Sequence, residues 1–154
     1  MVDGACKGAS EMGMDNITFI CPKYNTMHQP SNQVEWETQG FRMCDVTLFR
    51  IPNKDPKAEL CNRIYAETTK MELPENLARG KKVILGIDSE ICGTRHMKFL
   101  AKRYGVKVHT SMEGCLAELT EWINLLNGET HIEDSDAEGI RLTICSYNSW
   151  YRGA

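Results

Sequence analysis

The sequence contains no uninterrupted apolar segment of the ~20 residues that a membrane-spanning helix requires. Its first residues also lack the apolar core of a signal peptide, so the expected location is the cytoplasm. The net charge of −3 gives no reason to expect binding to a nucleic-acid duplex, which needs an excess of clustered lysine and arginine. These absences predict a cytoplasmic protein whose partner is neither a membrane nor a nucleic-acid duplex.

Common cofactor and metal motifs are missing as well. The sequence has no G-x-G-x-x-G, no P-loop and no C-x-x-C, which argues against dinucleotide, phosphate-loop and redox chemistry. The four histidines are scattered, and each is expected to lie on the surface or in the core: His28, His96, His109 and His131. We therefore expect neither a metal ion nor a cofactor.

Cysteine, by contrast, is abundant, with seven residues in the chain. Most of them lie inside apolar runs such as "FICP" and "LTICSY", where a free thiol packs as a small hydrophobe. An odd number of cysteines in a chain of 154 residues argues against a disulfide scaffold. The expected state is that of reduced cysteines in the core of a cytosolic protein.

Five short apolar segments predict β-strands, and three amphipathic segments between them predict helices. The strands are expected within 16–22, 44–52, 81–88, 106–110 and 140–147, and the helices within 71–80, 93–105 and 112–126. Loops are expected over 24–33 and 53–69. Because the strands are continuously apolar rather than alternating, they favour a parallel sheet covered on both faces, in a three-layer α/β fold. The chain is expected to form one domain, 1–154, with a flexible acidic linker at 127–139.

The expected ends of the helices rest on capping residues. Thr94 and Gly105 are placed to cap the 93–105 helix at its two ends. Thr110 and Glu113 fit a capping box before the 112–126 helix.

Two central blocks resemble the nucleoside 2-deoxyribosyltransferase-like family. They are "QVEWETQGFRMCDVTLFRIP" and "TTKMELPENLARGKKVILGID", and a later segment, "KRYGVKVHTSMEGCLAELTEWI", matches only in style. The resemblance extends over 16–126 and implies a Rossmann/flavodoxin-like fold with a parallel five-stranded sheet. It also implies a homo-oligomer, a dimer or larger, that transfers or hydrolyses the N-glycosidic bond of a (deoxy)nucleoside or nucleotide.

Within this resemblance, Glu72 matches the glutamate nucleophile that opens a helix in the family. From the residues alone, the alternative is that Glu72 caps its helix from the third position after Thr69. Pro74 departs from the glycine that the family usually has there. Because proline is tolerated in the first turn of a helix, the helix is expected to start near Leu73, which would free Glu72 from capping.

Glu37 is the second carboxylate that the resemblance implicates. It precedes Asp45 by eight positions, as an acidic residue does in the family, and its implied role is to orient Glu72 or to bind the sugar or base. Its alternative is an ordinary solvated helix residue. Trp36 is expected either in the core or as a surface on which the base stacks.

The last segment, "IRLTICSYNSWYR", resembles the strand and loop with which family members usually begin. The chain therefore resembles a circular permutation of the family, in which 127–139 bridges the normal ends; the alternative is an ordinary last strand. The resemblance then implies a substrate-binding loop that contains Ser146, Tyr147, Asn148, Ser149, Trp150 and Arg152.

A second class of function remains open from the sequence. The chain can instead be a nucleotide-binding or sensing α/β domain whose pocket binds without turnover. Pro74 in place of glycine favours this alternative, as does the lack of a second aspartate near Glu72.

Overall fold

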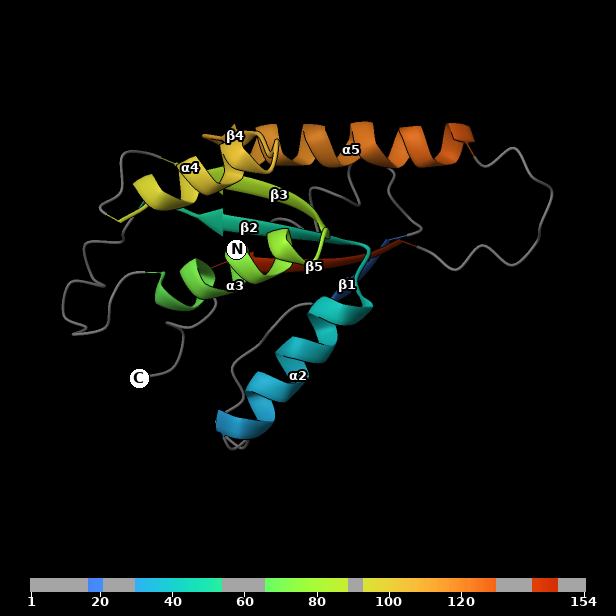
Figure 1. Cartoon of the computed structure of the whole chain (residues 1–154). Coiled ribbons are helices and arrows are strands. Elements are labelled where there is room, and N and C mark those ends of the chain that lie inside the picture. Colours follow the sequence, from blue (N-terminus) through green and yellow to red (C-terminus); the bar gives the residue numbers. More distant parts are fainter. Residues whose placement is uncertain (1–16, 21–29, 54–65, 89–92, 130–139, 147–154) are drawn as a thin grey trace.

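The structure, a computed structural model, describes residues 17–20, 30–53, 66–88, 93–129 and 140–146 (Figure 1). Strands and helices alternate along most of the chain. In chain order the elements are β1 (Ile17–Ile20), α2 (Pro30–Met43), β2 (Val46–Ile51), α3 (Glu67–Ala78), β3 (Lys82–Ile87), α4 (Arg95–Arg103), β4 (Val108–His109), α5 (Met112–Glu129) and β5 (Ile140–Ser146). None of the helices that the structure describes is long and apolar enough to cross a membrane.

The strands form a parallel sheet in the order β1-β5-β2-β3-β4. The α/β class with a parallel sheet, predicted from the sequence, is confirmed. β5 pairs with β1 on one side and with β2 on the other, so it lies inside the sheet. Side chains are described for β2, β3 and β4, whereas β1 and β5 are described by their backbones.

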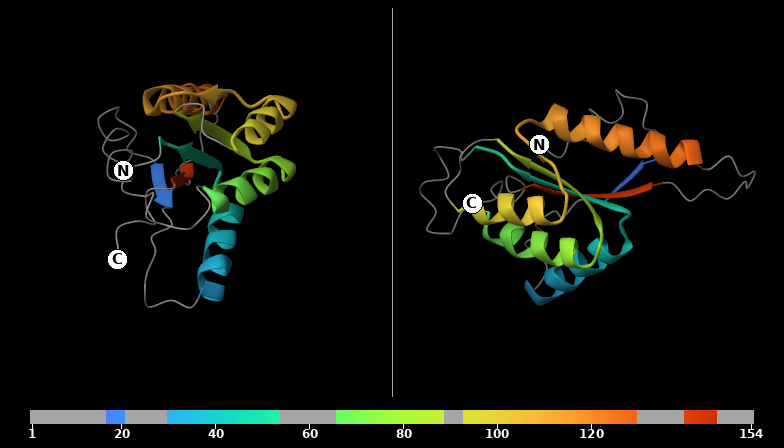
Figure 2. Two further views of the ribbon diagram at one scale, coloured as in Figure 1. Left: turned by 90° about the vertical axis from the view of Figure 1, so that its left-hand side faces the viewer. Right: turned by 45° about the horizontal axis from the view of Figure 1, so that its top comes forward.

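Helices cover both faces of the sheet, as the continuously apolar strands predict (Figure 2). On one face, α2, α3 and α4 pack over alternate residues of β2 and β3. On the other face α5 packs over Val46, Leu48 and Ile84. The ring of Phe41 stacks on that of Phe49 with centroids 6.1 Å apart, which fixes α2 against β2.

Two helices begin inside segments that were expected to be loops. α3 starts at Glu67 rather than near Leu73, so Pro74 lies inside the helix and the expected start is wrong. Ala66, just before α3, has φ 54° and ψ 31°, a left-handed conformation that no sequence signal marks. α2 starts at Pro30, inside the segment expected as a loop; proline is suited to a first helical position because its missing N–H needs no partner there.

A side-chain capping hydrogen bond is present at the start of α5, whereas the side chain of Thr94 makes none at the start of α4. Thr94 occupies the N-cap of α4, and Gly105, with φ 70°, follows the helix as expected. The expected Thr110–Glu113 capping box is wrong by one residue, because the backbone N–H of Gly114 donates to Ser111 Oγ at 3.1 Å. α5 continues to Glu129, so the first three residues of the expected linker are helical.

Gly86 in β3 allows two side chains to meet over the sheet. A Cβ atom there would lie 2.6 Å from Cys115 Sγ and 2.9 Å from Arg50 Cδ. We expect Gly86→Ala to lower the free energy of unfolding by about 1–3 kcal/mol, measured by urea denaturation, because the buried neighbours must shift. In a double-mutant cycle with Cys115→Ala, the penalty of the glycine substitution should shrink. Unchanged stability in Gly86→Ala would contradict this account.

Candidate functional site

Glu37 and Glu72 come from neighbouring helices on one face of the sheet. Glu37 lies one turn before Phe41 in α2, so both side chains face the protein interior, and Glu37 is only 9% exposed. Glu72 is partly buried near the middle of α3. The two carboxyls are close enough for the charge of Glu37 to raise the pKa of Glu72. The structure therefore places Glu37 near Glu72, and the alternative of a solvated Glu37 is wrong.

The pKa of the Glu72 carboxyl lies far above its usual value. The pKa of Glu72 is raised from 4.5 to about 8, chiefly by burial and in addition by the nearby charges of Glu37 and Glu75. At neutral pH Glu72 therefore carries a proton. A protonated carboxyl is a proton donor, whereas attack on carbon requires the anion.

A buried polar chain holds the backbone of α3 at Glu72. The Asn76 side-chain nitrogen Nδ2 donates to the carbonyl oxygen of Glu72 at 3.0 Å, and Thr47 Oγ1 of β2 donates to Asn76 Oδ1 at 3.4 Å. Both Thr47 and Asn76 are buried. Because α3 begins at Glu67, Glu72 lies inside the helix and neither caps nor opens it. Both sequence-based alternatives for its position are wrong.

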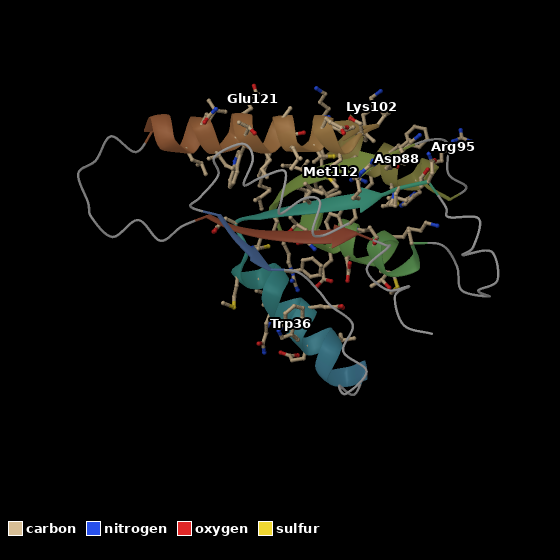
Figure 3. All side chains as sticks on the ribbon, turned by 180° about the vertical axis from the view of Figure 1, so that it is seen from behind. Trp36, Asp88, Arg95, Lys102, Met112 and Glu121 are labelled. Carbon is tan, nitrogen blue, oxygen red and sulfur yellow. The ribbon has the colours of Figure 1, made fainter. Side chains whose placement is uncertain are left out.

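Trp36 lies on the outside of α2 and is 47% exposed (Figure 3), so the expectation of a core tryptophan is wrong. Consecutive helical residues point about 100° apart, which directs Trp36 away from the face that carries Glu37. The geometry of α2 therefore does not place Trp36 beside the carboxyl pair.

The expected substrate-binding loop falls mostly outside the described residues. Ser146 is the last residue of β5, and its backbone lies opposite that of Arg50 in β2. The other expected loop residues lie outside the described part of the chain: Tyr147, Asn148, Ser149, Trp150 and Arg152.

Sequence reasoning missed a buried ion pair at the carboxyl ends of β2 and β3. The Arg50 side chain, 7% exposed, pairs through its guanidinium with the carboxylate of Asp88, which also accepts the backbone N–H of Asn53 at 3.2 Å. Arg50 lies on the α5 side of the sheet, against Cys115, whereas Glu37 and Glu72 lie on the other side. The signal in the sequence was an arginine inside the apolar run "VTLFRI".

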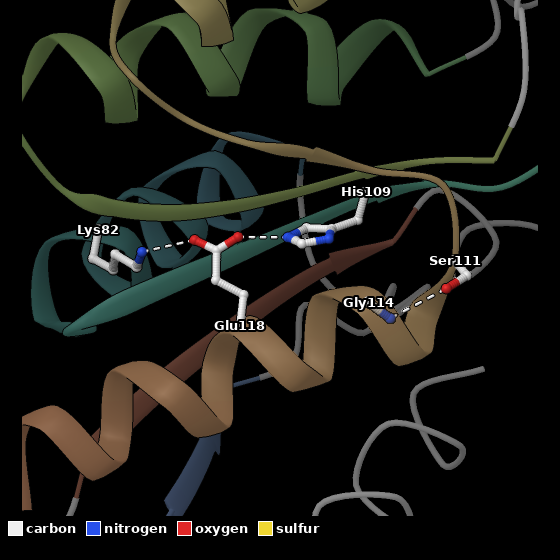
Figure 4. Close-up of polar contacts among 5 residues, drawn as sticks. All are labelled: Lys82, His109, Ser111, Gly114 and Glu118. Atoms are coloured by element: carbon white, nitrogen blue, oxygen red, sulfur yellow. Dashed lines mark hydrogen bonds and ion pairs between the residues drawn. The ribbon is translucent and has the colours of Figure 1, made fainter.

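A second network attaches α5 to the sheet (Figure 4). Glu118 of α5 pairs with Lys82 Nζ at 2.8 Å and with His109 Nε2 at 2.5 Å. Although burial acts to raise it, the hydrogen bonds from Lys82 and His109 hold the pKa of Glu118 below its usual range. This contact explains His109 as a packing residue, as the sequence suggested.

The described residues carry no sign of a metal site. In that part of the chain, no three histidine, cysteine, aspartate or glutamate side chains gather as a metal would need. The described thiols of Cys44 and Cys115 are free and buried, and burial raises the pKa of Cys115 to about 11, so both behave as core residues. A shallow hollow lies on α5, away from the carboxyl pair, and is lined by Ala117, Thr120, Glu121, Asn124 and Leu125.

Comparison with known proteins found no relative of this chain. No family model matches the chain, and no curated protein or solved structure is significantly similar to it.

Proposed function

We propose that the protein cleaves or transfers the N-glycosidic bond of a (deoxy)nucleoside or nucleotide at the Glu37–Glu72 pair. The observation that carries the proposal is the partly buried Glu72, whose pKa is raised to about 8 beside the charge of Glu37. A neighbouring pair of carboxyls, one protonated and one ionised, is the arrangement that retaining glycosidases use.

The raised pKa of Glu72 assigns the roles in the opposite sense to the sequence-based expectation. Glu72 gives its proton to the departing base as the bond from C1′ to the base nitrogen breaks, and the bonding electrons leave with the base. The Glu37 carboxylate then forms the new bond to C1′. Water or a second base displaces Glu37 from C1′, and its proton returns to Glu72.

The strand order supports a circularly permuted, five-stranded Rossmann/flavodoxin-like fold, which we include in the proposal. If β5 is counted as the first strand, the order β1-β5-β2-β3-β4 becomes 2-1-3-4-5, which is the flavodoxin-like order. In such a sheet the strand order reverses between β5 and β2, and ligands bind beyond the carboxyl ends of the strands there.

A binding domain without turnover is the second candidate. The observation that favours it is the position of Glu72 in the middle of α3, with Pro74 two residues later, rather than at the opening of a helix. Under this alternative, the carboxyl pair would recognise a nucleotide without attacking it.

The test is incubation with deoxynucleosides and their monophosphates, with and without an acceptor base, followed by chromatography of the free bases. Base release without an acceptor indicates a hydrolase, and exchange that needs an acceptor indicates a transferase. Ligand binding without either product supports the binding domain. Light scattering on the same sample tests the proposed homo-oligomer.

The pH dependence of the reaction should follow the Glu72 proton. Because the acid form is required, kcat/KM is expected to fall as the pH rises through about 8, the pKa of Glu72. Glu37→Gln cannot be used to test this fall in kcat/KM, because it removes the proposed nucleophile. Glu75→Gln is used instead. Glu75 makes the smallest of the three contributions that raise the pKa of Glu72, so Glu75→Gln should move the fall in kcat/KM to a slightly lower pH. A rate that rises through pH 8 would restore Glu72 as the nucleophile.

A further inference from the structure

The outer surface of α4 is strongly basic in a chain whose net charge is −3. No aspartate or glutamate occurs between Arg95 and Lys107. The cations in this stretch are Arg95, Lys98, Lys102, Arg103 and Lys107. This stretch of α4 and the residues after it therefore carries cations without any acids among them, which distinguishes it from a helix of mixed charge.

An exposed aromatic ring lies at the centre of this charge. Phe99 is 61% exposed, and the guanidinium carbon of Arg95 lies 5.7 Å from the centre of its ring. Lys102 and Arg103 follow Phe99 by three and four residues, so they share its face of the helix. We call Arg95, Phe99, Lys102 and Arg103 the α4 basic face; Arg95 and Lys102 are labelled in Figure 3.

The chemistry of this face selects among anionic partners. The apolar side of α4 is already used, because Met97 and Ala101 are buried against the core, and no second apolar stripe remains to enter a bilayer. An acidic peptide would need the cations but not an exposed ring. Single-stranded nucleic acid uses both, since its phosphates contact cations and its bases stack on aromatic rings.

We infer that the α4 basic face binds single-stranded nucleic acid. Phe99 stacks against an unpaired base, with Arg95 extending the planar surface. Lys102 and Arg103 contact the flanking phosphates. A duplex offers the same phosphates but keeps its bases stacked inside, so the ring has no partner there. This inference is independent of the carboxyl pair, which lies between α2 and α3.

The experiment is a fluorescence anisotropy titration of the full chain with a labelled oligothymidine single strand over a range of salt concentrations. With two cations in contact with phosphates, the logarithm of the association constant should fall with the logarithm of the salt concentration with a slope of about −1.4. Phe99→Ala should weaken binding about 5- to 150-fold, whereas Phe99→Trp should retain it. Lys102→Gln should reduce the steepness of the slope by about 0.7.

Matched controls come from exposed residues elsewhere. Leu125→Ala on α5 and Arg42→Gln on α2 remove an exposed apolar side chain and an exposed cation, and neither should change the affinity. Circular dichroism should show that Phe99→Ala remains folded, as expected for a ring that is mostly exposed. The inference is overturned if the single strand does not bind, or if Phe99→Ala binds as tightly as the original. Equal binding of polyglutamate, or binding of phosphatidylserine vesicles in place of the strand, also overturns it.

Discussion

Glu72→Gln is expected to slow release of an ordinary nucleobase by about 10²- to 10⁴-fold, the usual contribution of a general acid. Glutamine keeps the shape of the side chain but has no proton of suitable acidity to give to the base. The measurement is kcat/KM at pH 7 for the best substrate found in the panel. Glu75→Gln is the matched control, since Glu75 lies on the same helix, is 54% exposed and pairs with Arg79; its rate should change little.

The leaving group separates an acid from a nucleophile. A 7-methyl-2′-deoxyguanosine substrate carries a positive charge on its base, so its departure needs no proton. If Glu72 is the acid, Glu72→Gln should retain most of the activity toward this substrate. If the loss is equally large for both substrates, Glu72 is the attacking group, as the sequence resemblance implied.

Glu72→Gln should also stabilise the folded protein. The pKa of Glu72 is raised from 4.5 to about 8 in the folded state, so the folded state binds the proton more tightly than the unfolded state. Stability is therefore lost as the pH rises from about 4.5 to 8, because the unfolded chain releases a proton that the folded chain retains. Glutamine cannot ionise, so the midpoint of thermal unfolding should rise in Glu72→Gln, and more at pH 8 than at pH 5. Such a gain would mean that the protein gives up stability to keep a buried ionisable group at this position.

The main features of the fold were predictable because they depend on local patterns. Runs such as "VTLFRI" and "KVILGI" predict buried parallel strands, and the structure confirms the parallel sheet. The start of α3 was not predictable, because it depends on a left-handed Ala66 that no glycine marks. Proline inside the helix misled the prediction, since the tertiary contacts of Leu73 and Leu77 override its local preference.

The candidate site was predictable in its composition but not in its chemistry. The residues of the pair could be chosen from sequence by resemblance, since Glu37 and Glu72 lie in the two matching blocks. The protonation state of Glu72 could not be predicted from the sequence, because its pKa depends first on burial between elements that are far apart in the chain. Arg50 was missed for a related reason: its partner Asp88 lies on another strand end, and sequence distance conceals the contact.

Asp88→Ala is expected to be the most destabilising single substitution considered for this protein, at about 3–5 kcal/mol. The Arg50 side chain is 7% exposed, so removal of the carboxylate would take away the charge that pairs directly with a buried cation. The backbone N–H of Asn53 would also lose its acceptor. A loss of this size is a large part of the 5–15 kcal/mol that typically stabilises a domain. Urea denaturation with a constant m-value is the measurement.

Two further variants decide whether the buried charge is the cause. Glu75→Ala breaks the exposed Glu75–Arg79 pair and should cost under about 0.5 kcal/mol, because solvent screens that interaction. Asp88→Leu combined with Arg50→Met should recover much of the lost stability. It removes both charges of the pair and refills the site with apolar atoms. If the double variant is as unstable as Asp88→Ala, the loss arises from the strand end and the Asn53 contact rather than from the ion pair.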